Sequence, residues 1–535
     1  MWRSLFAGFC SLGLLVACTG GEQSVRATGL VYCSEGSPDS FNPQISTSGT
    51  AYDASAHPLY NRLVDLDPDT GTPQPALAES WTVSRDGTRW KFKLRRDVQF
   101  HRTAWFTPTR PFNADDVLFS FERQWRPRHP FHRVSGGNYT YFANIGLGEL
   151  LTGIVKRGEY EVEFQLREAN GSFLTMLSME FASILSAEYA AQVMQAGQPQ
   201  QLDQLPVGTG PFQLVRYDHG AFIRYEAHPD YFGGMAKVKR LVFAITPDAS
   251  LRLSRLRAGE CDVMAQPSPA HLPLIRQNSK LKLYSQPSLN ISYWAFNTRR
   301  PPLNDARVRQ ALNYAVNRAT ILDAVYFGAA EQAKSPVPPQ VPGHDHLLQD
   351  FRHDPDRARE LLREAGYGNG FTLDIWVMPV SRPYNPNAKK MAELIQDDLR
   401  QIGVNARIVS FEWRDFLRRL RLGEHDSVLL GWSGDLNDAD NFLTPLLSCD
   451  AIRAGSNRAL WCNNEFDDLL SKARGSRDPA VREQHYRAAQ ELFKAEAPWL
   501  TIAHSTQFLV ARQSIQGLRQ SASGGVYFHH AERRP

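Results

Sequence analysis

Histidines come first among the residues that could do chemistry, because two pairs stand at spacings short enough to share a metal ion. His129 is followed by His132, and His344 is followed by His346. A zinc site needs three or four ligands, and neither pair has a cysteine or a third histidine near it in sequence. We therefore interpret both pairs as solvated loop residues and predict no metal site.

The sequence contains no complete motif for covalent catalysis or nucleotide binding. The sequence contains no GxxxxGK[ST] and no HExxH. The run Gly431-Trp432-Ser433-Gly434 has the wrong spacing for the GxSxG nucleophile motif. The run Gly208-Thr209-Gly210-Pro211 lacks the third glycine of a dinucleotide-binding turn and has a proline where a helix should begin. We expect no enzyme activity and no cofactor, although an acid/base pair among the many carboxylates is left open.

The overall composition excludes two further classes of protein. The chain has 535 residues, with 60 Lys and Arg against 56 Asp and Glu, a net charge of +4. So small a net charge does not give the single-sign field of a dedicated nucleic-acid-binding protein. The apolar share of 42% and the charged share of 22% are those of a globular protein and exclude a disordered scaffold.

The amino-terminal residues have the pattern of an export signal. Arg3 precedes an apolar stretch from Leu5 to Val16, which is too short to span a bilayer, since spanning takes roughly 20 residues. The stretch ends in Leu15-Val16-Ala17-Cys18, which resembles a bacterial lipoprotein cleavage box. We predict that Cys18 is lipidated and becomes the new amino terminus; the alternative is an ordinary signal peptide. No later segment is apolar enough to span a membrane, so we expect an exported, soluble body.

Four cysteines remain in the body, namely Cys33, Cys261, Cys449 and Cys462. An even number in an oxidising compartment favours disulfides, and four cysteines allow three pairings. The pair Cys449–Cys462 closes a short loop and is the favoured local bridge, worth about 3 kcal/mol for a loop of that length. The pair Cys33–Cys261 then follows by elimination and would return the chain to its first domain.

The pattern of apolar residues predicts both strands and helices. Residues 81–83 and 90–95 alternate around an Asp-Gly turn and predict a hairpin. Farther along, residues 371–377, 389–402 and 404–409 read as strand, helix and strand, which favours a βαβ unit in a parallel sheet. Asp354-Pro355 and Asp478-Pro479 are expected to begin helices, because Asp caps and Pro suits the first turn. We interpret the apolar stripes of these helices as core.

Several short motifs, in the same order along the chain, make the sequence resemble the solute-binding proteins of peptide ABC importers, extracellular solute-binding protein family 5. The likeness runs from about Gly29 to the carboxyl terminus and is greatest to the family's dipeptide-binding members. The motifs are Leu30–Pro38, Thr47–Thr50, Leu59–Leu63, Phe112–Val117, Pro206–Phe212, Val308–Leu312, Arg382–Asn387 and Gly431–Asp435.

The resemblance implies an α/β fold of two lobes, a periplasmic-binding-protein clamshell of type II, cluster C, with an additional third domain. It implies the following division of the chain: a signal peptide over 1–17, a first lobe from 18–75, 211–288 and 505–535, an extra α/β domain over 76–210, and a second lobe over 289–504. It also implies the same two disulfide pairings.

The resemblance further implies which residues bind ligand. The Arg of the Arg-Pro-Tyr stretch, here Arg382, holds the ligand carboxylate, and the Asp that ends the Gly-rich loop, here Asp435, holds the α-ammonium. Arg presents a planar fork that suits a carboxylate, and a carboxylate suits the three donors of an ammonium. The full implied set is Thr47, Ser48, Gly49, Arg382, Pro383, Tyr384, Trp432, Ser433, Gly434 and Asp435.

The sequence also allows interpretations of these residues that involve no ligand. Arg382 alone in a Pro- and Asn-rich loop would be a surface residue. Asp435 shares an acidic loop with Asp438 and Asp440, which could be a solvated face or a cation site. Two departures from the dipeptide-binding pattern bear on the range of ligands: Ser433 stands where the family has Thr, and residues 436–439 also differ.

The function implied is capture of short peptides, dipeptides above all, and their delivery to an inner-membrane ABC permease. The resemblance places the protein in the bacterial periplasm or cell envelope as a monomer, held to the membrane only by the lipid on Cys18, with no nucleic-acid partner. The alternatives are haem, longer peptides or a peptide-like metallophore as ligand, or a sensor role. An envelope peptidase is the enzymatic alternative, and no motif supports it.

Overall fold

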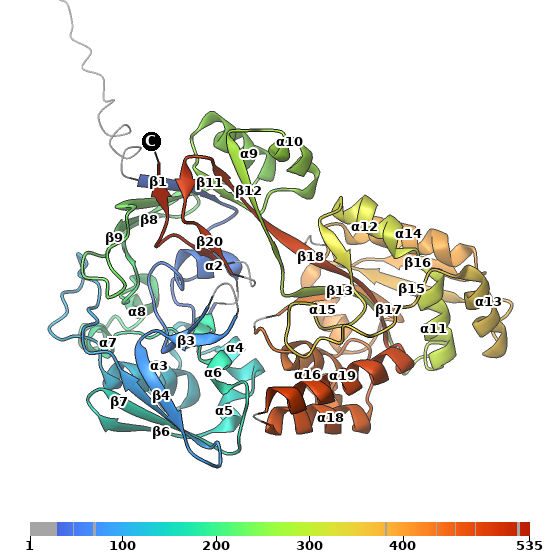
Figure 1. Cartoon of the computed structure of the whole chain (residues 1–535), viewed down its shortest axis with the longest axis horizontal. Coiled ribbons are helices and arrows are strands. Elements are labelled where there is room, and N and C mark those ends of the chain that lie inside the picture. Colours follow the sequence, from blue (N-terminus) through green and yellow to red (C-terminus); the bar gives the residue numbers. More distant parts are fainter. Residues whose placement is uncertain are drawn as a thin grey trace, which may run out of the picture.

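The computed structural model describes residues 29–46, 48–67, 71–379, 382–434, 436–454, 456–476, 478–521 and 525–534. The predicted signal segment and Cys18 lie outside these residues. Figure 1 shows two halves side by side, blue to green in one and yellow to red in the other, with a long strand running from one half to the other. Helices and strands alternate along both halves, so the predicted α/β class is confirmed.

One twelve-stranded sheet passes through both halves. Its order is β16-β15-β17-β13-β18-β11-β1-β10-β9-β8, and β12 and β14 also pair with β18. The strands are β1 (Gly29–Ser34), β8 (Phe212–Asp218), β9 (Phe222–Ala227), β10 (Arg240–Ile245), β11 (Val263–Ala265), β12 (Leu281–Pro287), β13 (Asn290–Phe296), β14 (Ala330–Gln332), β15 (Thr372–Val377), β16 (Asn405–Val409), β17 (Ser427–Ser433) and β18 (Trp499–Arg512).

Strand β18 ties the two halves together. It is 14 residues long, and its residues are almost all buried. Its amino-terminal part pairs with β13 and β14, while its carboxyl-terminal part pairs with β11 and β12. Because it is buried along almost its whole length, its sequence lacks the alternation of a half-exposed strand, and the polar residues 504–507 stand between two largely apolar ends.

The first lobe is built around β1, which is parallel to β10 on one side and to β11 on the other. Strands β8, β9 and β10 continue this part of the sheet as antiparallel neighbours. Its helices are α2 (Gly49–Ala54), α9 (Ala249–Ala258) and α10 (Leu272–Arg276), with a short 3₁₀ turn at Pro269–His271. Carboxyl-terminal pairs complete it, namely β19 (Ile515–Gln516) with β22 (Glu532–Arg533) and β20 (Arg519–Gln520) with β21 (Val526–Tyr527).

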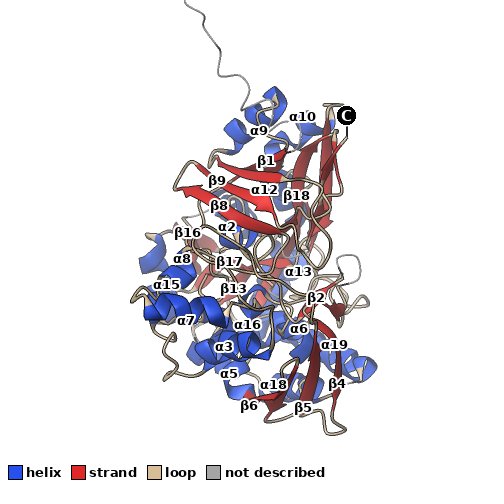
Figure 2. Ribbon diagram, turned by 90° about the vertical axis from the view of Figure 1, so that its left-hand side faces the viewer, coloured by secondary structure: helices blue, strands red, loops and turns tan. Residues whose placement is uncertain are grey.

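The extra domain has its own antiparallel sheet of order β4-β5-β7-β6, which lies below the first lobe in Figure 2. Its strands are β4 (Ala78–Val83), β5 (Arg89–Leu94), β6 (Leu151–Gly158) and β7 (Glu161–Leu166), and β2 (Val64–Leu66) pairs with β3 (Pro73–Pro75) beside it. Its helices are α3 (Ala114–Trp125), α4 (Thr140–Asn144), α5 (Leu147–Leu150), α6 (Phe173–Met176), α7 (Ala187–Gln195) and α8 (Gln201–Gln204), with 3₁₀ turns at Val134–Gly136 and Glu180–Ala182. The predicted hairpin is confirmed as β4 and β5, with Gly87 at a φ of 75° in the turn.

The second lobe contains the predicted βαβ unit. Strand β15 is parallel to β16, and helix α14 (Ala388–Arg400) connects them. Strand β15 is also parallel to β17 on its other side. The other helices are α11 (Ala306–Ala315), α12 (Arg318–Tyr326), α13 (Pro355–Glu364), α15 (Trp413–Arg421), α16 (Asp440–Leu447), α17 (Cys449–Ala454), α18 (Asn464–Gly475) and α19 (Pro479–Glu496).

Local capping explains where several helices begin. The side chain of Asp354 accepts a hydrogen bond from the backbone N–H of Arg357, and that of Asp478 accepts one from Ala480, so both predicted helix starts are confirmed. Asn113 and Asp116 form a capping box at the start of α3. The residues at which each of the three domains begins and ends remain predictions.

Both predicted disulfides are present. The Cα atoms of Cys33 and Cys261 are 5.9 Å apart, and those of Cys449 and Cys462 are 4.6 Å apart. The first bridge joins β1 to the segment that leads into β11, and the second joins the start of α17 to the loop before α18. Each lobe thus has one covalent tie of its own.

The histidine pairs differ in part from the sequence-based interpretation. His344 is not solvated: it is 5% exposed, and its Nδ1 lies 2.7 Å from the carbonyl oxygen of Val337. Among the described residues, no group of three or more His, Cys, Asp or Glu side chains could hold a metal, and no helix could span a membrane.

Candidate functional site

The two loops predicted to hold the ligand's charges lie at one edge of the second-lobe sheet. Strands β15 and β17 are parallel neighbours, so their carboxyl ends point the same way. The loop that carries Arg382 follows β15, and Gly434 follows β17 directly. Ligands of open α/β sheets bind outside the carboxyl ends of the strands, and this is the edge that both loops occupy.

The Arg382 loop is a tight turn packed on β17. The backbone N–H of Arg382 donates to the carbonyl of Asn385 at 3.1 Å, and the N–H of Asn385 donates back at 2.9 Å. Pro383 is exposed, whereas the Tyr384 ring lies against Gly431, where an added Cβ would be 2.2 Å from Tyr384 Cδ2. Burial raises the pKa of the Tyr384 hydroxyl, and the nearby Arg382 guanidinium opposes this shift. The structure therefore brings Arg382 and Tyr384 together at the end of β17.

The end of β17 is shaped by close backbone packing. The N–H of Gly434 donates to the carbonyl of Leu289 at 2.5 Å, and an added Cβ at Gly434 would lie 2.3 Å from the Phe442 ring. Ser433 is exposed and pairs with Asn290 of β13. Trp432 is half-buried, and its Nε1 has no hydrogen-bond partner among the described residues. A side chain at position 434 would collide with the Phe442 ring, so this packing favours glycine there.

The first lobe contributes the loop after β1. The Ser48 side chain caps α2 by accepting a hydrogen bond from the N–H of Ala51 at 3.1 Å, and its hydroxyl lies 3.2 Å from Asp39 Oδ1. Gly49 begins α2, and a Cβ there would meet nothing within 4 Å. Thr47 and Asp435 lie outside the described residues. The ligand-binding roles of the whole set stay predictions.

The chain crosses between the lobes at a hydrogen-bonded joint. Asn290 Nδ2 donates to Ser505 Oγ at 2.7 Å, and the N–H of Ser505 donates to Asn290 Oδ1 at 2.9 Å. The neighbouring His504 places its Nδ1 2.6 Å from the carbonyl oxygen of Asn290, and burial lowers the pKa of His504 to about 4. These side-chain bonds fix the point where β12 ends, β13 begins and β18 runs past both.

A cavity of about 460 Å³ lies where the lobes, the extra domain and this joint meet. Its lining includes His57 and Arg62 of the first lobe, Glu180 of the extra domain, and Leu289 and Asn437 of the second lobe. Arg62 is 4% exposed, and its Nε and Nη1 have no hydrogen-bond partner among the described residues. Burial lowers the pKa of His57 to about 3 and raises that of Glu180. Since Leu289 also contacts Gly434, the cavity adjoins the loop at the end of β17.

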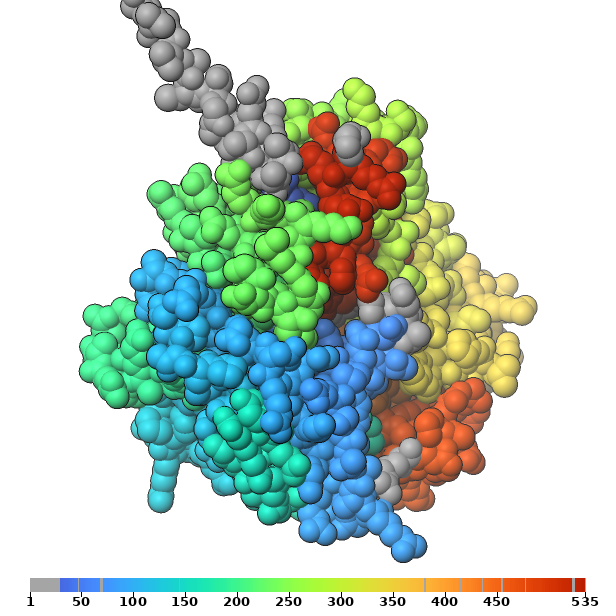
Figure 3. Space-filling model, turned by 60° about the vertical axis from the view of Figure 1, so that its left-hand side comes forward, coloured from blue at the N-terminus to red at the C-terminus, as the bar shows by residue number. Residues whose placement is uncertain are grey.

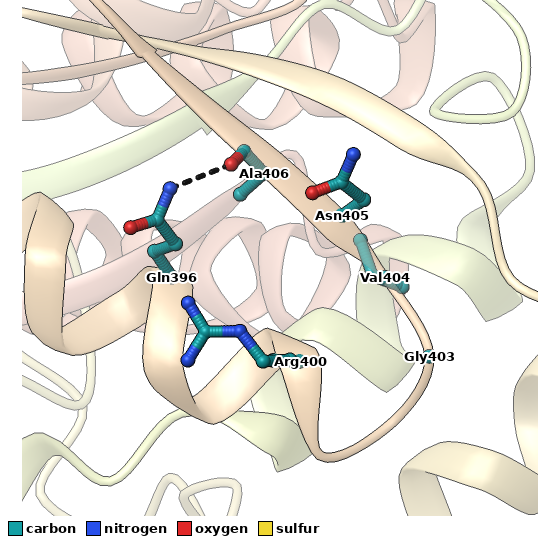
Figure 4. A pocket seen from close by; sticks show the side chains of 6 residues that line it. All are labelled: Gln396, Arg400, Gly403, Val404, Asn405 and Ala406. Atoms are coloured by element: carbon teal, nitrogen blue, oxygen red, sulfur yellow. Dashed lines mark hydrogen bonds between the residues drawn. The ribbon is translucent and has the colours of Figure 1, made fainter.

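A second hollow, of about 160 Å³, lies far from this chemistry. Figure 4 shows it between the end of α14 and the start of β16, with Gln396 donating to the carbonyl of Ala406 at 2.7 Å. Because it is at the amino end of β16, it lies at the opposite edge of the sheet from the Arg382 loop. Its Arg400 is exposed and paired with Asp397, so nothing in it is arranged to hold a ligand.

Comparison with known proteins identifies the family. The model of the bacterial extracellular solute-binding proteins, family 5 (Middle), matches residues 72–453. The chain belongs to this family. It is 47% identical to the dipeptide-binding protein of Escherichia coli (strain K12) over 524 residues, 98% of each chain. It is 45% identical to heme-binding protein A of Haemophilus influenzae over 499 residues, 93% of this chain and 91% of that protein.

Solved structures of the family agree with the fold. The crystal structure of the dipeptide-binding protein of Pseudoalteromonas sp. SM9913 in complex with Met-Leu matches with a TM-score of 0.83 and 44% identity, over 95% of this chain and all of that one (100%). The prediction of a two-lobed periplasmic-binding-protein fold is confirmed by this match.

Sequence reasoning missed the interlobe residues of this family-5 protein. Arg62 and His57 gave no signal, because a buried cation and a buried imidazole look like ordinary surface residues in a sequence. Ser172 was not singled out from the sequence, and Asp438 was noticed only as part of an acidic loop. Their hydrogen bond, 266 residues apart in sequence, appears only in the folded chain.

Proposed function

We propose that this family-5 protein binds short peptides, dipeptides above all, between its lobes and delivers them to an inner-membrane ABC permease. The observation that carries the proposal is the position of the Arg382 and Gly434 loops at one sheet edge, where Gly434 contacts Leu289 in the wall of a cavity that both lobes line. The relatives named for dipeptides support the same ligand class.

The proposed chemistry follows from the charges of a zwitterion. A dipeptide brings one carboxylate and one ammonium, and both must be met once closure removes water. Arg382 would hold the carboxylate, and Asp435 would hold the ammonium. Thr47, Ser48 and Gly49 would contact the peptide from the first lobe. Fixing both ends selects length, while loosely packed, hydrated side-chain pockets leave the sequence unspecified.

A set of matched ligands tests this proposal. Alanyl-alanine, its N-acetyl derivative and its C-terminal amide have nearly the same shape but lose one charge each. We expect isothermal titration calorimetry to give one-to-one binding of the free dipeptide and at least about tenfold weaker binding of both derivatives, since each leaves one buried charge unpaired. Equal affinity for all three would remove the two-charge mechanism, and no binding of any di- or tripeptide would remove the function.

Haem is the second candidate ligand, favoured by the 45% identity to heme-binding protein A of Haemophilus influenzae. Longer peptides and peptide-like metallophores belong to the same alternative. A spectrophotometric titration tests haem binding, because bound haem shifts and sharpens its Soret band. A saturable Soret change that dipeptide does not compete away would favour haem over the peptide proposal.

Location and partners form the remaining part of the proposal. We infer that the protein works in the periplasm as a monomer, anchored through lipid on Cys18, with no catalytic role and no resident cofactor. A sensor role for the loaded form is the alternative to transport. Mass spectrometry of the mature amino terminus tests the anchor: diacylglyceryl on Cys18 supports it, and an unmodified terminus contradicts it.

A further inference from the structure

We propose that Leu436, Asn437 and Asp438, which follow the candidate ligand loop, form a clasp that holds the second lobe against the first lobe and the extra domain. Each of the three residues contacts the other half of the molecule at a different place. The proposal rests on the proposed function only where it concerns affinity for peptide. The clasp residues would act as positioning residues, because they set lobe closure and are not themselves offered as ligand contacts.

Leu436 is the apolar part of the clasp. It is 4% exposed and packs in the hydrophobic core of the first lobe and extra domain. The other residues between 289 and 504 that belong to a described hydrophobic cluster lie in the separate core of the second lobe or in a small cluster at its border. Opening the lobes would withdraw this side chain from apolar surroundings into water, which is unfavourable.

Asn437 places its side chain against the backbone of the first lobe. An added Cβ at Gly71 would lie 2.4 Å from Asn437 Nδ2, so the side chain rests directly on the Gly71 backbone. Gly71 has a φ of 69°, a conformation that glycine adopts without strain. Both residues line the cavity of about 460 Å³. This contact therefore closes one wall of the space in which the ligand is expected.

Asp438 is the polar part of the clasp. Within the second lobe it forms an ion pair of 2.5 Å with Arg482 of α19. Ser172 of the extra domain joins this pair: its hydroxyl donates to Asp438 Oδ2 at 2.6 Å and accepts from Arg482 Nη2 at 3.1 Å. Asp438 and Arg482 form their ion pair without help from Ser172. The second lobe therefore offers the Ser172 hydroxyl both an acceptor, Asp438, and a donor, Arg482.

The residue before Ser172 allows the two surfaces to meet. An added Cβ at Gly171 would lie 2.6 Å from Arg482 Nη1 and 2.9 Å from the carbonyl oxygen of Ser476. In Figure 1 the extra domain, with α6, faces α16, α18 and α19 across the lower part of the molecule. Figure 3 shows the blue amino-terminal residues in front, with orange residues of the second lobe behind them at the lower right. The contact next to α6 is therefore separate from the crossing of β12 and β18, which lies higher in Figure 1.

The test uses the full chain, with alanyl-alanine as the probe. Ser172→Ala removes the interlobe hydrogen bonds and leaves the Asp438–Arg482 pair intact. We expect it to raise the Kd about 5- to 10-fold through faster dissociation, with the melting temperature unchanged. Leu436→Ala should raise the Kd at least about tenfold, and Leu436→Met should restore it, because Met fills a similar volume. Ser84→Ala is the matched control: it also removes a Ser–Asp hydrogen bond in the extra domain, at the exposed turn between β4 and β5.

Stopped-flow dissociation and small-angle X-ray scattering read out the result. Faster dissociation in Ser172→Ala and Leu436→Ala, with Ser84→Ala like the unmodified protein, supports the clasp. Unchanged affinity and dissociation in both clasp variants overturn it. If the unmodified protein binds no dipeptide, the proposed function fails, and scattering without ligand decides alone. A larger radius of gyration for Leu436→Ala than for the unmodified protein then supports the clasp, and equal radii overturn it.

Discussion

At the scale of single residues, Gly431 is the glycine beside the Arg382 and Gly434 loops that has the least room for a side chain. Its Cα lies under the Tyr384 ring and beside the carbonyl oxygen of Ile291, and an added Cβ would approach these at 2.2 and 2.5 Å. Both distances are shorter than any tolerated contact, and the second partner is backbone. The side chain of Tyr384 and the turn that carries Arg382 can keep their places only because position 431 is glycine.

Replacing this glycine is therefore a test of the site's architecture. We expect Gly431→Ala to lower the free energy of unfolding by about 1–3 kcal/mol, the usual cost of overpacking, and to weaken dipeptide binding by displacing the Arg382 turn. Chemical denaturation and calorimetry measure the two effects. Gly475→Ala is the control, because a Cβ there would meet nothing within 4 Å. Unchanged stability and affinity in Gly431→Ala would show that Tyr384 does not hold the turn in place.

At the scale of elements, the sequence predicts those helices, strands and turns that depend on residues close together in the chain. The Asp354 and Asp478 caps, the hairpin around Gly87 and the βαβ unit from 371 to 409 all depend on residues close together in the chain. Strand β18 could not be predicted in the same way, because it has no alternating pattern and its four neighbours come from distant segments. The interlobe contacts of Ser172 and Leu436 escaped prediction for the same reason.

For the candidate site, too, some features could be predicted from the sequence and others could not. Resemblance pointed to the Arg382 and Gly434 loops, and the parallel pairing of β15 with β17 places both loops at one edge. The buried Arg62 and the joint between Asn290 and Ser505 were not predicted, since their significance lies in burial and in contacts more than 200 residues apart, as for Asn290 and Ser505 (215). A single sequence records residue type and spacing, and neither reports burial of a polar group.

The two disulfides are elements whose removal should have unequal effects. Cys33–Cys261 spans 228 residues and Cys449–Cys462 spans 13. On the chain-entropy account, the longer loop loses more freedom in the unfolded state, so the first bridge contributes about 5 kcal/mol and the second about 3 kcal/mol. We expect urea denaturation of Cys33→Ser/Cys261→Ser to show the larger loss of stability. A larger loss from Cys449→Ser/Cys462→Ser would mean that native-state packing of α17 and α18, and not unfolded-chain entropy, dominates.

At the scale of the whole molecule, buried histidines link stability to pH. Burial lowers the pKa of His57 and His101 to about 3, and that of His425 and His504 to about 4. They lie in both lobes, in the extra domain and at the joint between the lobes. A proton taken up by any of them therefore destabilises the folded protein. In the unfolded chain each should titrate near pH 6.5.

The sign of the effect follows from proton uptake. Between about pH 6.5 and 4 the unfolded chain binds protons that the folded chain does not, so the free energy of unfolding falls as the pH is lowered through this window. Each histidine should contribute a loss of about 2 kcal/mol between pH 7 and pH 5, at 1.36 kcal/mol per pKa unit. His504→Gln keeps a polar side chain beside the carbonyl of Asn290 but cannot titrate. Urea denaturation at both pH values should therefore show a fall in stability about 2 kcal/mol smaller in this variant. If the variant and the unmodified protein lose the same amount, then His504 is protonated in the folded state and its burial at the joint does not resist charge.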